Sequence, residues 1–325
     1  MRITPELMTE ANSVFLRSIF VPDVLNGASQ NVAFSPVGVH FMVTMLKELI
    51  SAPLYSDWDR LASHTNLIHL NKQLQTNPTI TSKSVIAGRE WSKSVPTDFL
   101  MDHFKVFNSV DVKSIGKYLE ADVSELASAT GATVHLLKFN GSWQTKFTGN
   151  QSVKFSDGIE YSFMKAIVPS VPWFENDDLT VVTLPFKIDE GFEDVCIDLI
   201  LPKHEGRAVD LNEHKKWISN QIIQSKAKIV IPKVKLEYKE KINLSSDSAI
   251  ESLQKIRVEW DENGVKGEAI TMSMARSLPP PIPEFIASRQ FLFIIRQEAL
   301  WLFVGRISSI DASLNMGKRI AYQEL

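Results

Sequence analysis

The sequence predicts a single α+β domain, and three observations lead to that class. Short apolar segments rich in valine, isoleucine and phenylalanine recur along the chain, which is typical of buried strands. Near the N-terminus, by contrast, apolar residues recur at helical spacing. The 325 residues allow one large domain or two medium ones, but no linker, repeat or low-complexity tract divides them, and 44% are hydrophobic, enough for a sizeable core.

The N-terminal region carries the clearest helices. Residues 12–20 have the spacing of an amphipathic helix. Residues 31–34 lead into a strongly apolar segment that ends at Ile50, which predicts a short strand followed by a buried helix. Ser35 is a favourable N-cap residue and Pro36 suits the first helical turn, so the helix is expected to begin there.

The second half of the chain is rich in strands. Val195–Pro202 and residues 227–234 are dominated by isoleucine and valine and predict two strands, with a short helix at 215–223 between them. Residues 291–295 and 300–304 are apolar and joined by a short link, which predicts a hairpin of two buried strands.

Composition, charge and the N-terminal sequence argue against several kinds of partner and location. A net charge of −3 argues against binding nucleic acid or a membrane surface through bulk charge. No apolar segment approaches the about 20 residues of a membrane span. The N-terminus lacks an apolar secretory core, so an intracellular protein of the cytoplasm or nucleus is expected. The single cysteine, Cys196, forms no intrachain disulfide and is expected to be a small buried hydrophobe.

Enzymatic activity is not expected. The chain contains no Gly-x-Ser-x-Gly elbow, no His-Glu-x-x-His, no phosphate-binding loop and no Gly-x-Gly-x-x-Gly. Its seven histidines form no short-range metal pattern with cysteine or carboxylates. We therefore expect neither catalysis nor a cofactor or metal, with a hydrolase of unrecognised triad as a minor alternative.

The segment around Arg276 carries the most specific signal. Arg276 followed by Ser277 suits a protease with an acidic specificity pocket, which needs such a pair in an extended strand. The three prolines at 279–281 fix a stiff, extended segment that cannot continue a sheet. On these residues alone, an ordinary surface loop before a core hairpin is an equal alternative.

The stretch from Glu262 to Arg306 resembles the reactive-centre loop and C-terminal hairpin of serpins, and its RSLPPP and EFIA runs resemble the plant branch of that family. The resemblance implies a large mixed β-sheet with smaller sheets and surrounding helices, in one domain over 1–310. An exposed reactive-centre loop is then expected at about 262–285. The tail 311–325 has no family counterpart and is expected to be solvated. The family also implies a monomer, with extracellular space as the alternative location.

The order of family elements assigns further segments. It implies a strand at 85–91, a helix at 94–106, and the long strand in the middle of the large sheet at 133–141. Additional strand signatures lie at 155–164 and 181–186. The resemblance thus touches most of the chain in order.

The mechanism of serpins implies a role for the loop. After a protease cuts the bait bond, the loop inserts as an extra strand into the large sheet and drags the acylated enzyme with it. By resemblance, Arg276–Ser277 is the bait for a trypsin-like serine protease or an Arg-specific cysteine protease. Small side chains alternate on one face of the expected hinge, which comprises Glu262, Gly264, Val265, Gly267, Ala269 and Thr271.

The resemblance also assigns residues that gate the sheet. Glu262 is expected to pair with Lys233, and Trp143 to mark the point where the sheet opens. Ser35 matches one hydroxyl of a polar cluster beneath the sheet.

Three positions of that polar cluster depart from the family. A serine is replaced by Gly38, an asparagine by His135 and a histidine by Gln254. A buried network functions only when each member is satisfied, so partial replacement is expected to alter how the sheet opens. The alternative is a compensated pair of His135 with Gln254.

Two functions follow from these observations. A loop cut at Arg276 is about two residues shorter than usual, and only 28 residues separate Lys233 from Glu262. These features favour a degenerate, non-inhibitory serpin that acts as a protease substrate or interaction protein. The bait bond and the small hinge residues favour the alternative, an active suicide inhibitor.

Overall fold

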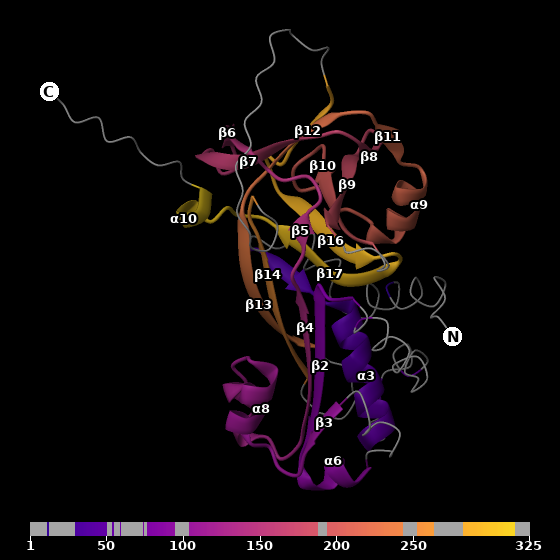
Figure 1. Cartoon of the computed structure of the whole chain (residues 1–325), viewed down its shortest axis with the longest axis vertical. Helices are drawn as coiled ribbons and strands as arrows, with labels where there is room; N and C mark the ends of the chain where they lie inside the picture. The colour runs from indigo at the N-terminus through magenta and orange to yellow at the C-terminus, as the bar shows by residue number, and fades with distance from the viewer. Residues whose placement is uncertain are drawn as a thin grey trace, which may run out of the picture.

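The structure is a computed structural model, and it describes residues 12, 30–50, 54, 59, 74, 77–94, 104–187, 194–242, 252–262 and 282–315. Figure 1 shows an elongated molecule, with most strands gathered at one end and four strands running toward the other. These four strands are β2 (Ile80–Ala87), β4 (Ala132–Phe139), β13 (Val234–Ile242) and β14 (Ser252–Trp260). No helix of the described part is long and apolar enough to cross a membrane.

The largest sheet has eight strands, with seven in the order β1-β17-β16-β10-β9-β8-β11 and β5 paired to β9. Their bounds are β1 Val32–Phe34, β5 Ser142–Trp143, β8 Val171–Glu175, β9 Leu179–Lys187, β10 Val195–Pro202, β11 Ile222–Gln224, β16 Phe291–Gln297 and β17 Leu300–Ile307. Every residue of β10 and β17 is buried, as expected for strands made mostly of apolar residues. Gly305 allows β1 to approach β17 closely, because a Cβ at this position would lie 2.5 Å from the carbonyl oxygen of Val32.

A four-stranded sheet packs at the same end, in the order β15-β12-β7-β6. Its strands are β6 (Gly149–Lys154), β7 (Glu160–Val168), β12 (Ala227–Ile231) and β15 (Glu284–Ile286). β15, which follows the expected reactive-centre loop, runs parallel to β12. The end of that loop is therefore anchored in this sheet.

The four strands that run toward the other end form two separate ladders. β3 (Phe104–Phe107), β2 and β4 make a three-stranded sheet, and β13 and β14 make a two-stranded one. Among the described residues, no backbone pairing joins β4 to β14. The expectation that 133–141 occupies the middle of the large sheet is thus wrong, because β4 ends its own small sheet.

The helices lie around these sheets. α3 (Pro36–Ile50) packs against β4, β14 and β17, and the N–H of Gly38 donates to Ser35 Oγ at 3.1 Å, so Ser35 is the N-cap. The other helices of the described residues are α6 (Arg89–Ser94), α8 (Val112–Leu119), η1 (Ser124–Ser128), η2 (Leu211–Glu213), α9 (His214–Ser219) and α10 (Ala312–Asn315).

Most predicted elements are confirmed, including the strand before α3, β10 with the buried Cys196, and the β16–β17 hairpin. Two helix predictions need correction. Residues 104–106 of the helix expected at 94–106 belong to the strand β3, whereas its residues 95–103 lie outside the described residues. The helix expected at 215–223 ends at Ser219, after which β11 begins. The helix expected at 12–20 lies outside the described residues except for Asn12, whose amide donates to the carbonyl of Ala299 at 2.9 Å.

The beginning of the C-terminal tail also differs from expectation. Asn315 in α10 is fully buried, whereas a solvated tail was predicted. Its Oδ1 accepts from the N–H of Lys233 at 2.8 Å, and its Nδ2 donates to the carbonyl of Lys233 at 2.9 Å. The amide thus satisfies both backbone groups of the residue that leads into β13.

Candidate functional site

The gap between β4 and β14 is the candidate functional site. Both strands present an edge without a described backbone partner there, and α3 packs behind both of them. Some of the residues expected to gate the sheet lie at the end of the gap marked by Trp143 and Glu262, which we call its upper end. The others lie beneath the gap, on the side of α3. Their contacts determine what holds the two ladders together.

At the upper end, polar contacts join the two sides. The indole Nε1 of Trp143 donates to the carbonyl of Asp261 at 2.7 Å, and the N–H of Phe147 donates to the carbonyl of Glu262 at 3.1 Å. Trp143 is buried and stacks on Phe186, with ring centroids 4.9 Å apart. This end of the gap is therefore closed by backbone acceptors that Trp143 and Phe147 engage.

Lys233 and Glu262 form an ion pair at the same end, as the sequence predicted. The pair is partly exposed, with side-chain exposures of 27% and 31%, so it contributes at most about 1 kcal/mol by itself. Its position is fixed by Asn315 on the side of Lys233 and by Phe147 on the side of Glu262. Backbone hydrogen bonds thus hold both residues of the pair in position.

Beneath the gap, Gln254 of β14 bonds to the start of α3. Its Oε1 accepts from the N–H of Ser35 at 3.0 Å, and its Nε2 donates to the carbonyl of Ser35 at 2.9 Å. A Cβ at Gly38 would lie 3.1 Å from Ser35 Oγ and 3.3 Å from Gln254 Nε2. Because Gly38 has no side chain, there is space for the side chain of Gln254 beside it.

His135 belongs to the other side of the gap. Its Nδ1 shares a hydrogen bond of 2.9 Å with Ser84 Oγ on β2, and its ring stacks on Phe41 at 4.0 Å. Its Nε2 is shielded and has no described hydrogen-bond partner, and burial lowers the pKa of His135 to about 3. The expected compensation between His135 and Gln254 is wrong, because Gln254 is matched by Gly38 and Ser35 instead.

The bait bond and most of the hinge lie outside the described residues. Of the residues predicted for them, the structure places Glu262, and β15 follows the loop. Gly264, Val265, Gly267, Ala269, Thr271, Arg276 and Ser277 are not described. Their roles stay predictions.

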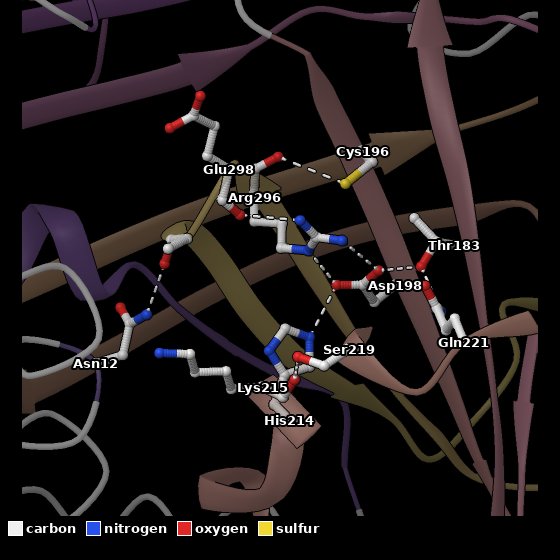
Figure 2. Close-up of polar contacts among 11 residues, drawn as sticks. Asn12, Thr183, Cys196, Asp198, His214, Lys215, Ser219, Gln221, Arg296 and Glu298 are labelled. Atoms are coloured by element: carbon white, nitrogen blue, oxygen red, sulfur yellow. Dashed lines mark hydrogen bonds and ion pairs between the residues drawn. The ribbon is translucent and has the colours of Figure 1, made fainter. Parts of the chain in front are cut away.

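One polar cluster was missed by the sequence analysis (Figure 2). Asp198 is fully buried in β10, and its carboxylate accepts from Thr183 Oγ1 at 2.6 Å, from Arg296 Nε at 2.5 Å and from His214 Nε2 at 2.8 Å. Burial alone would raise the pKa of Asp198, but the His214 hydrogen bond and the Arg296 charge outweigh it and lower the pKa to about 2. Gln221 extends the cluster by donating to Thr183 Oγ1 at 2.7 Å.

The signal that could have found this cluster is an acidic residue inside an otherwise apolar strand, CIDLILP. A buried carboxylate in such a strand requires partners, here supplied by β9, β16 and α9. The cluster fixes α9 to the large sheet. The described residues include no group of three or more potential metal ligands, so no metal centre is assigned from them.

Comparison with family models gave no match. Serpin-Z1 of Arabidopsis thaliana is 25% identical over an alignment of 374 residues, which covers 91% of this chain and 94% of Serpin-Z1. The structure of Serpin48 from the insect Tenebrio molitor matches with a TM-score of 0.66 at 17% identity, over 94% of this chain and 98% of Serpin48. Human thyroxine-binding globulin matches with a TM-score of 0.70 at 15% identity, over 94% of this chain and 98% of that protein.

These structural matches show the serpin fold, and the plant protein matches over nearly the whole length of both sequences. The sequence motifs, the α+β architecture and the polar residues around the gap agree with both. The chain therefore has the serpin fold and is similar to Serpin-Z1 over nearly its whole length.

Proposed function

We propose that this serpin offers Arg276–Ser277 as a cleavage site to an arginine-specific protease and does not trap the enzyme that cuts it. The observation that carries the proposal is that the polar residues in the middle of β4 and β14 bond away from each other. His135 bonds to Ser84 within its own sheet, and Gln254 bonds to Ser35. No hydrogen bond of the described residues joins the middle of β4 to β14.

Trapping needs a resting state that keeps the loop out of the sheet until cleavage. That requirement concerns the kinetic barrier to loop insertion, and not only the stability of the inserted state. Contacts between the two strands that must part supply such a barrier in a switch of this kind. Without them, the barrier that keeps the loop out of the sheet is lower, so the sheet can open before a protease arrives. A loop about two residues short adds to this effect, because each strand residue advances by about 3.3 Å.

A titration with trypsin tests the proposal. Samples are boiled in denaturant, separated by mass on a gel and analysed by mass spectrometry, while residual trypsin activity is measured. We expect one cut after Arg276, full trypsin activity and no species at the summed mass. In Arg276→Ala this cut should disappear, whereas Arg289→Ala, in a described segment that bonds to the carbonyl of Pro202, should be cut like the parent.

The alternative is an active suicide inhibitor of trypsin-like serine proteases or Arg-specific cysteine proteases. The closed upper end of the gap favours it, because the contacts of Trp143 with Asp261 and of Lys233 with Glu262 are in place. A boil-resistant band at the summed mass, absent in Arg276→Ala, would overturn the first proposal in favour of this one. Rapid cutting at many sites would contradict both.

A further inference from the structure

The segment from α8 to η1 contacts both ladders that flank the gap. On one side, Ile115, Leu119 and Val123 pack in an apolar cluster with Val85 and Ala87 of β2. Shortly after η1 the chain continues into β4. This packing fixes the segment to the three-stranded sheet.

On the other side, Glu125 of η1 reaches the two-stranded ladder. Its Oε1 accepts from Lys239 Nζ of β13 at 2.9 Å, and its Oε2 accepts from Lys255 Nζ of β14 at 2.6 Å. Lys255 Nζ also donates to the carbonyl of Asp122 at 3.1 Å. The attachment to this ladder is therefore ionic, whereas the attachment to the other sheet is apolar. We call Glu125, Lys239 and Lys255 the Glu125 strap.

The two lysines face each other directly. Lys239 and Lys255 are register partners in the antiparallel pairing of β13 with β14. Like charges opposite each other destabilise such a pair, and a carboxylate between them removes that repulsion. Glu125 thus contributes both to the tether and to the ladder that it holds.

We propose that the Glu125 strap is an ionic latch that holds the β13–β14 ladder against the three-stranded sheet, and that its release lets the two ladders separate. It takes the place of backbone pairing, which the described residues lack between β4 and β14. Hydrogen bonds from Lys255 and Lys239 lower the pKa of Glu125 to about 2, so the carboxylate stays charged at neutral pH. The latch is consequently sensitive to salt, because its side chains are 30–50% exposed.

Glu120 provides a matched control. It pairs with Lys83 of β2 at 2.9 Å and with Lys138 of β4 at 4.0 Å, so it too is a glutamate near α8 that binds two lysines. Both partners, however, belong to the three-stranded sheet. Replacing Glu120 removes ion pairs of similar kind without touching the connection between the ladders.

The test is hydrogen exchange of the full chain, followed by mass spectrometry, for the parent, Glu125→Gln and Glu120→Gln at about 0.05 M and about 1 M sodium chloride. We expect Glu125→Gln to raise the exchange rate in β4, β13 and β14 about tenfold at low salt. High salt should do the same in the parent. Glu120→Gln should leave these strands protected. Equal rates in Glu125→Gln and the parent, or an equal effect of Glu120→Gln, would overturn the proposal.

A second set of variants separates the latch from a general loss of folding. Lys239→Gln combined with Lys255→Gln leaves η1 unchanged and should still increase exchange in β4, because the tether is gone. Charge reversal, with Glu125→Lys, Lys239→Glu and Lys255→Glu together, should restore protection at low salt. Failure of the reversed set to restore protection would contradict an ionic latch. These readouts are independent of whether a protease is trapped.

Discussion

Gln254 holds Ser35 by both ends of its amide, with the N–H of Ser35 donating to Oε1 at 3.0 Å and Nε2 donating to the carbonyl at 2.9 Å. The carbonyl of Ser35 also accepts from the N–H of Val39, so it stays satisfied without the glutamine. The N–H of Ser35 has no such second partner among the described bonds. Gln254 is thus the residue that allows this N–H to be buried.

Gln254→Leu is therefore expected to lower the free energy of unfolding by about 1–3 kcal/mol, the cost of a buried donor without an acceptor. Urea unfolding followed by tryptophan fluorescence measures this change. Gln224→Leu, on the edge strand β11, serves as the control and should change stability by less than about 0.5 kcal/mol. Equal values for the two variants would contradict the assigned role of Gln254.

Gly38→Ala tests the fit between Gly38 and Gln254. Alanine is the better helix former by about 1 kcal/mol, but its Cβ would press on Ser35 Oγ and Gln254 Nε2, both held by hydrogen bonds. We expect Gly38→Ala to destabilise the parent and to cost less in Gln254→Ala, in which the contact with Gln254 Nε2 is gone while that with Ser35 Oγ remains. The double-mutant cycle measures this difference. An equal cost in both backgrounds would contradict the steric explanation.

Arg296→Met is expected to be severely destabilising. It leaves the fully buried Asp198 with Thr183 and His214 but without its permanent positive charge, at a cost of about 3–5 kcal/mol. Arg257→Met, which removes exposed ion pairs to Glu237 and Glu259, should cost less than about 1 kcal/mol. Adding Asp198→Leu to Arg296→Met should recover part of the loss. Additive losses in that double variant would contradict a coupled pair.

Acid should destabilise the protein through its buried histidines. Burial lowers the pKa of His40 to about 4 and that of His135 to about 3, whereas unfolded histidine titrates near 6.5. As the pH falls below 6.5 the unfolded chain binds protons first, so stability is full above that pH and is lost toward pH 4. At about pH 5 the loss is about 2 kcal/mol per histidine.

Urea unfolding at about pH 7.5 and about pH 5 measures this loss. His135→Asn should reduce the difference between the two pH values, whatever its effect at pH 7.5. His204→Gln, at an exposed position, should leave the difference unchanged. A parent whose stability is equal at both pH values would contradict the prediction.

Sequence patterns correctly predicted the elements that depend mainly on residues close together in the chain. The Ser35 cap of α3, the apolar run of β10 and the β16–β17 hairpin follow from neighbours in the sequence. The helix predicted at 94–106 is wrong at its described end, because Phe104–Phe107 pairs with β2. Its strand character is a tertiary effect that overrides local propensity.

The polar contacts around the gap could be predicted only in part. Matching residue by residue predicted the ion pair of Glu262 with Lys233, but it could not determine which partners the replaced residues bind. That choice depends on space, since Gly38 opens room for Gln254, and on a neighbouring strand, since Ser84 binds His135. The Asp198 cluster joins residues up to 113 positions apart, from Thr183 to Arg296, which no local pattern relates.

The order of strands in the large sheet has a consequence for how the protein is made. β17 lies between β1 and β16. The strand β1, near the start of the described chain, can therefore form its pairing with β17 only after residues near the end of the described chain have been synthesised. On the ribosome, β1 and β10 are synthesised long before the hairpin that separates them. Their edges therefore lack β16 and β17 as partners until the hairpin has been synthesised, so this sheet can close only after residue 307 has emerged from the ribosome.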